Sequence, residues 1–153
     1  MRKIDLAYLA GIFDGEGSIS IARVERKGRK NPRYQLAVSL SICTPYIPNL
    51  FKMGFGGSIN VQERGGKRRP IWTWRPGIKE GLCFLEVINP YLRLKKDEAL
   101  LALQFEQGKE KRHFCPGHSR TEKEIVLFEA EKILLHKMHD KTGFRGNHIP
   151  LDI

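Results

Sequence analysis

The chain has 153 residues, a length that suits one domain with a hydrophobic core. It carries 27 Lys and Arg against 17 Asp and Glu, a formal net charge of +10 that indicates a polyanionic partner, nucleic acid before a membrane surface. No apolar run approaches the roughly 20 residues of a bilayer span, and the amino terminus turns polar too soon for a signal peptide. Three widely spaced cysteines indicate reduced thiols, as in an intracellular compartment such as an organelle or the prokaryotic cytoplasm.

The first half of the chain predicts two units, each a helix followed by two strands. Asp5 can cap the first helix, which is expected to stop at 15–17, where two glycines permit the backbone angles that end helices. In the strand 34–42, apolar residues face one way and small polar residues the other, which predicts a sheet with one core face and one hydrogen-bonding face. The other elements expected in this half are a helix at 46–53 and strands at 18–22, 57–64 and 71–75.

The second half has helical periodicity. Apolar residues recur at helical spacing in 78–88 and 95–107, and Thr121 forms a capping box with Glu124 that opens a third helix. The stretch 139–153 contains Gly and Pro without a period, so we expect a tail there.

The resulting order, α-β-β-α-β-β-α, predicts an α+β fold. Strands with one apolar face need helices on one side only, so we expect a curved four-stranded antiparallel sheet packed by helices on one face, plus C-terminal helices. Because the chain has no internal repeat or long linker, residues 1–153 are expected to form one domain. Its core would be about 5–107, its C-terminal helical extension about 108–139 and its tail 140–153.

The strongest signal is the nonapeptide at 9–17, Leu-Ala-Gly-Ile-Phe-Asp-Gly-Glu-Gly. It closely resembles the motif that names the LAGLIDADG homing endonuclease family, and the segment Pro-Tyr-Leu-Arg-Leu-Lys-Lys at 90–96 looks like the one before a core helix in that family. The resemblance covers about 5–107 and agrees with the predicted element order. It implies a homing endonuclease that binds a long pseudo-palindromic site in double-stranded DNA. Such an enzyme hydrolyses one phosphodiester in each strand with a divalent metal, Mg²⁺ or, at the same site, Mn²⁺ or Ca²⁺.

The helix that carries the motif has a stripe of small residues. Ala7, Gly11 and Gly15 are spaced by four, so another helix can approach this stripe closely. That helix belongs either to the chain's own core or to a second copy of the chain. Single-motif chains of the family dimerise, so the resemblance implies a homodimer with its two-fold axis between these helices. The implied interface residues are Ala7, Ala10, Gly11, Asp14 and Gly15.

Glu16 follows the carboxyl end of the predicted helix, where the helix dipole disfavours negative charge by about 0.3–1 kcal/mol. Because Glu16 has no basic neighbour in sequence, its negative charge has to be offset by another positive charge, which a divalent cation provides. Two such carboxylates at a two-fold axis would also repel each other and favour a bound cation further. Oxygen ligands favour Mg²⁺, which can activate water and neutralise a leaving oxygen in phosphodiester cleavage. The alternative is a solvated turn acid. By resemblance, the Gly15 carbonyl is a second ligand, Asp14 has a local hydrogen-bonding role, and the family more often has Asp at position 16.

The resemblance implies two further residues near the scissile phosphate. Lys95 matches a basic residue of the family that would stabilise developing charge or order the hydrolytic water. Its alternative is a surface lysine at the start of a helix. Thr44, followed by Pro45, falls where family members often carry a polar residue such as Gln just after the second strand.

The open sheet face is expected to lie in the major groove of DNA, where Arg suits guanine, Gln and Asn suit adenine, and small side chains suit the thymine methyl group. The candidate base contacts are Ser20, Ala22, Val24, Arg26, Gln35, Ala37, Ser39, Ser41, Asn60, Gln62, Arg64, Thr73 and Arg75. The candidate phosphate contacts at the hairpin tips are Lys27, Arg29, Lys30, Arg33, Lys67, Arg68 and Arg69. Trp72 and Trp74 lie on the opposite face, and their alternation favours core packing.

Two other functions share parts of this pattern. A relative that binds without cleaving, as an intron RNA maturase or a transcription regulator, would keep the sheet and the charge; the intact acid at Glu16 favours the enzyme. A structural or chaperone-like RNA binder that relies on charge alone would not need ordered small polar strand faces. The His and Cys residues of 113–118, with His136 and His139, lack the spacing of a complete zinc ligand set.

Overall fold

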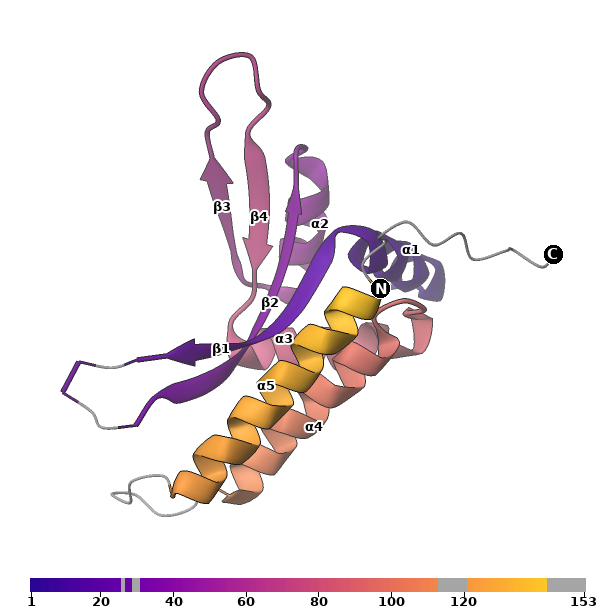
Figure 1. Cartoon of the computed structure of the whole chain (residues 1–153). Helices are drawn as coiled ribbons and strands as arrows, with labels where there is room; N and C mark the ends of the chain where they lie inside the picture. Colours follow the sequence, from indigo (N-terminus) through magenta and orange to yellow (C-terminus); the bar gives the residue numbers. More distant parts are fainter. Residues whose placement is uncertain (26, 29–30, 113–120, 143–153) are drawn as a thin grey trace.

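The computed structural model describes residues 1–25, 27–28, 31–112 and 121–142, and it confirms the α+β class. In these ranges four strands form one antiparallel sheet in the order β1-β2-β4-β3 (Figure 1). The strands are β1 (Gly17–Val24), β2 (Arg33–Ile42), β3 (Ser58–Gln62) and β4 (Ile71–Arg75). The helices are α1 (Lys3–Glu16), α2 (Tyr46–Phe55), α3 (Ile78–Ile88), the 3₁₀ turn η1 (Asn89–Tyr91), α4 (Lys96–Arg112) and α5 (Glu122–Thr142).

The sheet consists of two hairpins that share only a short junction. β1 pairs with β2 along its whole length, from Gly17 opposite Leu40 to Val24 opposite Arg33. β4 pairs with β2 only at 40–42, so the two hairpins diverge beyond this junction and project in different directions (Figure 1). This divergence gives the sheet its strong curvature.

A buried carboxylate supports the strand that the divergence leaves without a neighbour. The backbone N–H of Leu36 in β2 donates to Glu106 Oε1 of α4 at 3.1 Å, and Lys109 Nζ donates to the same carboxylate at 2.7 Å. Buried backbone N–H groups are nearly always paired, so α4 supplies here the acceptor that β4 would supply in a regular sheet. The long separation of α4 from β2 in sequence explains why no local pattern indicates this contact.

An aromatic cluster fills the space between the sheet and the first three helices. The rings of Phe13, Phe51 and Phe84 pack with Trp74, and the Trp74 and Phe84 centroids lie 5.0 Å apart, edge to face. Trp74 Nε1 donates to the Gly56 carbonyl at 2.8 Å, so the indole N–H is satisfied despite full burial. The predicted core role of Trp74 is therefore confirmed, whereas Trp72 is only half-buried.

The predicted alternation of the strands is confirmed with one exception. Leu36, Val38 and Leu40 are buried on the helix side, and the residues between them lie on the open side. Alternation with Ile59 in β3 would place Val61 on the core side, but its side chain is 46% exposed. It pairs with Trp72 beyond the end of the helical layer, so no helix covers it.

Several helix ends differ from the expectation. Asp5 was expected to precede α1 as its cap, but α1 begins at Lys3 with Arg2 at the N-cap position. Asp5 lies in the first turn and accepts hydrogen bonds from the Arg2 backbone and side chain. It ends without a left-handed glycine: Gly17 is extended at φ −79°, and the helix continues directly into β1. A Cβ at Gly17 would collide with the Phe13 ring, so close packing rather than backbone freedom explains this glycine.

The C-terminal helices are longer than predicted. α4 runs on to Arg112, and α5 runs from Glu122 to Thr142, so the first four residues of the expected tail at 139–153 are helical. Lys, Glu and Leu, which dominate α5, are good helix formers, and no Gly or Pro interrupts it. Residues 143–153 lie outside the described part of the chain, as does the possible zinc segment 113–118. No described helix is long and apolar enough to cross a membrane.

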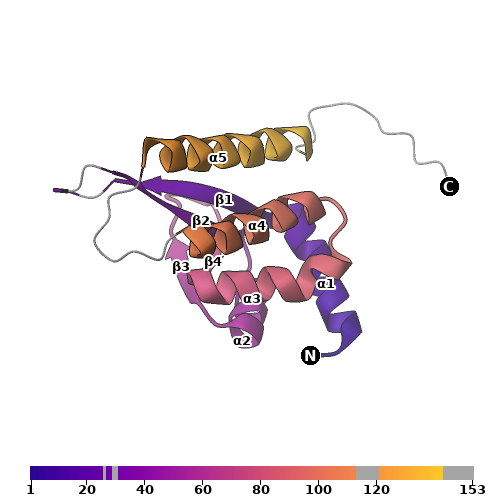
Figure 2. The ribbon, with the colours of Figure 1, turned by 90° about the horizontal axis from the view of Figure 1, so that it is seen from below.

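α5 lies beside α4 and along the edge strand β1 (Figures 1 and 2). Phe128 of α5 stacks on Tyr34 of β2 with centroids 5.6 Å apart. The Tyr34 hydroxyl donates to Glu129 Oε2 at 2.6 Å, and Lys132 Nζ donates to Glu129 Oε1 at 2.8 Å. The hydrogen bond from Lys132 and, to a smaller extent, the one from Tyr34 hold the pKa of Glu129 below its usual value.

This pair of bonds predicts a pH dependence of stability. A carboxyl whose folded pKa is lowered stabilises the fold above its unfolded pKa of roughly 4.3, and this stabilisation is lost as the pH falls through the folded pKa. We expect Glu129→Gln to lower the free energy of unfolding by about 1 kcal/mol or less at pH 7, because the pair is partly exposed, and by less at pH 2.5. Urea unfolding of both proteins at the two pH values measures this; an equal difference at both would contradict the assignment.

Candidate active site and nucleic-acid face

Glu16 is the last residue of α1, and its side chain is exposed. Within the described ranges no hydrogen bond or ion pair holds its carboxylate. Gly17 follows as the first residue of β1 and pairs with Leu40 near the end of β2, so Glu16 lies at the end of the sheet where the β1–β2 hairpin joins β4. The preceding Gly15 is exposed, and nothing lies within 4 Å of a Cβ built on it. The C-terminal end of α1 therefore presents an accessible carboxylate next to accessible backbone.

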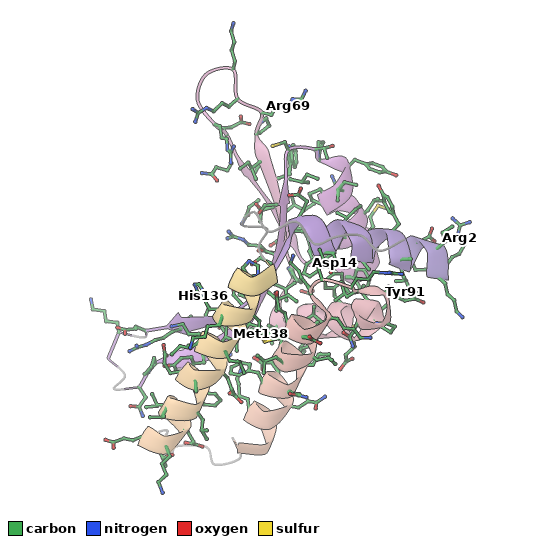
Figure 3. The ribbon with its side chains drawn as sticks, turned by 45° about the vertical axis from the view of Figure 1, so that its right-hand side comes forward. Arg2, Asp14, Arg69, Tyr91, His136 and Met138 are labelled. Atoms are coloured by element: carbon green, nitrogen blue, oxygen red, sulfur yellow. The ribbon has the colours of Figure 1, made fainter. Side chains whose placement is uncertain are left out.

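Asp14 fixes the segment that leads into α4. Its Oδ2 accepts from the Arg93 backbone N–H at 2.8 Å, and its Oδ1 accepts from the Lys95 N–H at 3.0 Å. Figure 3 shows Asp14 on the side of α1 that faces this segment. Asp14 has a hydrogen-bonding role as expected, but that role is not local, because its partners lie 79 and 81 positions away in sequence. Its reach across the chain is a feature that local sequence patterns do not reveal.

Lys95 completes the connection in the opposite direction. Its side chain is only 7% exposed, and Nζ donates to the Asp14 carbonyl at 2.5 Å. The alternative of a surface lysine is therefore wrong. The ammonium lies at the carbonyl end of α1, on the carbonyl two residues before Glu16, where it offsets the negative end of the helix dipole. The resemblance indicated Lys95 near the site, but no sequence pattern indicated its hydrogen bond to the Asp14 carbonyl.

The Asp14 connection predicts a large stability effect. We expect Asp14→Ala to lower the free energy of unfolding by about 2–4 kcal/mol, because two backbone N–H donors lose a buried acceptor. Asp5→Ala, which removes an acid whose hydrogen bonds to Arg2 are exposed to solvent, is the matched control and should lower the free energy of unfolding by much less. Urea denaturation followed by circular dichroism measures both. Equal losses in the two variants would contradict the structural role of Asp14.

Thr44 follows the end of β2 and is half-buried. It lies at the same end of the sheet as Glu16, because β2 ends where β1 begins. In the described part of the structure its hydroxyl has no hydrogen bond to Glu16 or Lys95. The arrangement therefore brings Glu16, Gly15 and Lys95 together at one helix end and leaves the role of Thr44 a prediction.

A metal at this end would have one carboxylate per chain. Among the described residues no group of three or more His, Cys, Asp or Glu side chains has the arrangement of a metal site. Mg²⁺ is typically held by one or two carboxylates, several waters and substrate phosphates. An exposed Glu16 beside the Gly15 carbonyl has the oxygen ligands that such a site needs from one chain.

The outer face of α1 is small and apolar. Gly11 and Gly15 are exposed, nothing lies within 4 Å of a Cβ built on either, and Ile4 and Tyr8 are 69% and 55% exposed on the same helix. The chain's own core therefore does not use this stripe. Two residues of the predicted interface require correction: Ala10 is fully buried and Asp14 bonds within the chain. They lie on the core side of α1, one position from the exposed stripe.

The open sheet face carries the polar residues that the alternation predicts. Open-face pairs in the register are Ser20 with Ala37, Ala22 with Gln35, Ser41 with Thr73 and Asn60 with Thr73. Ser41 and Thr73 share a hydroxyl hydrogen bond of 2.9 Å at the junction of the hairpins. The other predicted base contacts of this face are Val24, Ser39, Gln62 and Arg75, whereas Arg64 follows the end of β3.

The predicted phosphate contacts lie toward the hairpin ends. Figure 3 shows Arg69 near the end of the β3–β4 hairpin, in the connection that also carries Lys67 and Arg68. Lys27 lies in the β1–β2 connection, and Arg33 begins β2. Arg26, Arg29 and Lys30 lie outside the described residues. The predicted phosphate contacts that the structure describes are thus at the far ends of both hairpins, away from Glu16.

No protein-family model matches the sequence, and no curated protein matches it. Solved structures match well over most of the chain. The homing endonuclease I-CvuI, in complex with the I-CreI target in the presence of Mg, matches with a TM-score of 0.65 and 19% identity over 96% of this chain and 87% of that one. The archaeal intron-encoded homing endonuclease I-Vdi141I, complexed with DNA, matches with a TM-score of 0.63 and 15% identity over 95% and 87%.

A third match has a different length. The LAGLIDADG homing endonuclease I-GzeII, in complex with its DNA target, matches with a TM-score of 0.57 and 18% identity over 73% of this chain but only 38% of that one. The chain thus corresponds to nearly all of I-CvuI and I-Vdi141I and to well under half of I-GzeII. The chain has the fold of the LAGLIDADG homing endonucleases.

Proposed function

We propose that the chain is a site-specific homing endonuclease that acts as a homodimer on double-stranded DNA. The observation that carries the proposal is the exposed carboxylate of Glu16, which has no partner in the described chain. It stands where the open sheet face meets the exposed glycine stripe of α1. A carboxylate with a structural role would have a partner, as Asp14 does.

DNA binding is supported by the open sheet face and the charge. A curved sheet face with Ser, Thr, Asn, Gln and Arg side chains offers hydrogen-bond donors and acceptors to base edges in a major groove. The net charge of +10 offers phosphate contacts that strengthen binding at low salt. The matched structures of I-CvuI and I-Vdi141I are complexes with a DNA target or with DNA.

Phosphodiester hydrolysis would depend on a divalent ion at the end of α1. Glu16 and the Gly15 carbonyl would hold it, and when bound it supplies an activated water and neutralises the leaving oxygen. Lys95 is a positioning residue: its ammonium on the Asp14 carbonyl and the Asp14 carboxylate on two N–H groups fix the end of α1 against the start of α4. This keeps Glu16 in one place relative to the sheet.

A homodimer would complete the site. One chain supplies one Glu16 and one curved sheet, which is half of what cleavage of two strands requires. The match to 87% of I-CvuI and only 38% of I-GzeII supports a chain that is one unit of a two-unit arrangement. The stripe of Ala7, Gly11 and Gly15 is the surface where α1 of a second copy would pack.

The experiment that tests the proposal is a cleavage selection. Purified protein is incubated with Mg²⁺ and a plasmid library that contains randomised or genomic inserts, beside the Glu16→Gln variant. We expect recurrent cuts at one long, near-palindromic sequence, absent with the variant. Binding to DNA or intron RNA without any cutting would overturn the endonuclease in favour of a maturase or a transcription regulator.

A further inference from the structure

A groove of about 120 Å³ runs between the outer edge of β1 and helix α5. Its lining consists of Ser18, Ile19, Ser20 and Ile21 from β1 and of Lys132, Leu135, His136 and His139 from α5. Ser18 and Ser20 belong to the open face of the sheet, so the groove borders that face. It also begins two residues from Glu16. We call this feature the α5 groove.

The α5 side of the groove is held in place by contacts to other elements. His139 Nδ1 lies 3.3 Å from Glu98 Oε2 of α4, and the Glu98 carboxylate is buried. Leu135 is buried, and Phe128, seven residues before it on α5, stacks on Tyr34. The C-terminal half of α5 is therefore fixed beside β1, and its outward groups keep a defined position relative to the sheet.

The rim of the groove is basic and its wall is largely apolar. Lys132 has three N–H donors, of which Glu129 Oε1 accepts one at 2.8 Å. His136 is exposed, and Figure 3 shows it on the flank of α5 beside β1. Ile19, Ile21 and Leu135 contribute the apolar wall. A row of donors above an apolar surface matches the two parts of a nucleic-acid backbone, the charged phosphates and the deoxyribose rings.

We propose that the α5 groove contacts the DNA sugar-phosphate backbone beside the cleavage site, with Lys132 and His136 donating to phosphate oxygens. The proposal rests on the proposed DNA binding and extends its surface from the sheet to a helix outside the hairpins. Because the groove borders the open face, DNA on that face would pass along it at the edge strand. His139 and Glu98 act as positioning residues that hold α5 in place.

Salt-dependent binding tests the proposal on the full chain with a mixed-sequence DNA duplex in Ca²⁺. Each lost phosphate contact lowers the slope of log affinity against log salt by about 0.9. We expect Lys132→Gln/His136→Gln to lose about one unit of slope and roughly tenfold in affinity. The control Lys79→Gln/Lys123→Gln removes two exposed cations, on α3 and at the far end of α5, and should change the slope by much less.

Three outcomes can be told apart. A larger loss of salt slope and affinity in the groove variant than in the control, with an unchanged unfolding midpoint, supports the contact. The single variant His136→Gln leaves the Lys132–Glu129 pair intact and should show a smaller loss of affinity of the same kind. Equal slopes for the groove variant, the control and the unaltered chain overturn the contact and leave the proposed function standing. No salt-dependent binding by the unaltered chain overturns both.

Discussion

Glu16→Gln is expected to slow DNA cleavage by about a thousandfold or more while DNA binding stays within about twofold of the unaltered chain. The substitution keeps the size of the side chain but removes its charge. Glu16 is exposed and has no partner in the described structure, so the fold loses no contact. The base contacts proposed for the sheet are untouched. Chemistry and binding should therefore separate in this variant.

Single-turnover cleavage in Mg²⁺ and binding in Ca²⁺ measure the two quantities on the site found by selection. Glu86→Gln, an exposed acid on α3, is the matched control and should cleave at the normal rate. Glu16→Asp retains a carboxylate on a shorter side chain and should cleave at an intermediate rate, with a changed preference among Mg²⁺, Mn²⁺ and Ca²⁺. Full activity of Glu16→Gln would remove the carboxylate from the mechanism and leave it a solvated acid.

The fold could be predicted because its main signals are local. Alternation along β1 and β2 separated a core face from an open face, and the structure buries Ile19, Leu36 and Leu40 as that pattern requires. The order of helices and strands then left one arrangement, with helices on one side of the sheet. Element ends were less predictable, because capping competes with propensity at each end. Asp5 acts inside the first turn of α1, and α5 continues past the point where its apolar period stops.

The surroundings of the candidate site could be predicted only in part. The nonapeptide identified Glu16, Gly15 and the glycine stripe because they are contiguous in sequence. The Asp14 bonds to the 93–95 segment join residues 79 and 81 positions apart, and nothing near Asp14 in sequence indicates them. The same holds for Glu106, which supports β2 from α4. Such long-range polar contacts depend on backbone groups that the strand geometry leaves unpaired, and this appears only in three dimensions.

A substitution at Gly11 can test the proposed dimer without disturbing the fold of the single chain, because the described fold has nothing within 4 Å of a Cβ at this position. An added Cβ would contact no described residue of the single chain, and replacing a mid-helix glycine improves helix propensity by up to about 1 kcal/mol. At a close helix–helix contact in a dimer, the same side chain would force the two α1 helices apart. The two effects have opposite signs, so one substitution tests the interface without unfolding the protein.

Gly11→Leu is expected to leave the unfolding free energy of the monomer equal or higher and to weaken the dimer by at least about thirtyfold, the loss typical of a central interface position. Sedimentation equilibrium measures the association, and the variant should nick one strand or fail to cut where the unaltered chain breaks both. Glu86→Leu adds the same side chain to an exposed position of α3 and should leave association unchanged. If Gly11→Leu still forms a dimer of normal affinity, α1 does not form the interface, and the two Glu16 carboxylates would not meet at a two-fold axis.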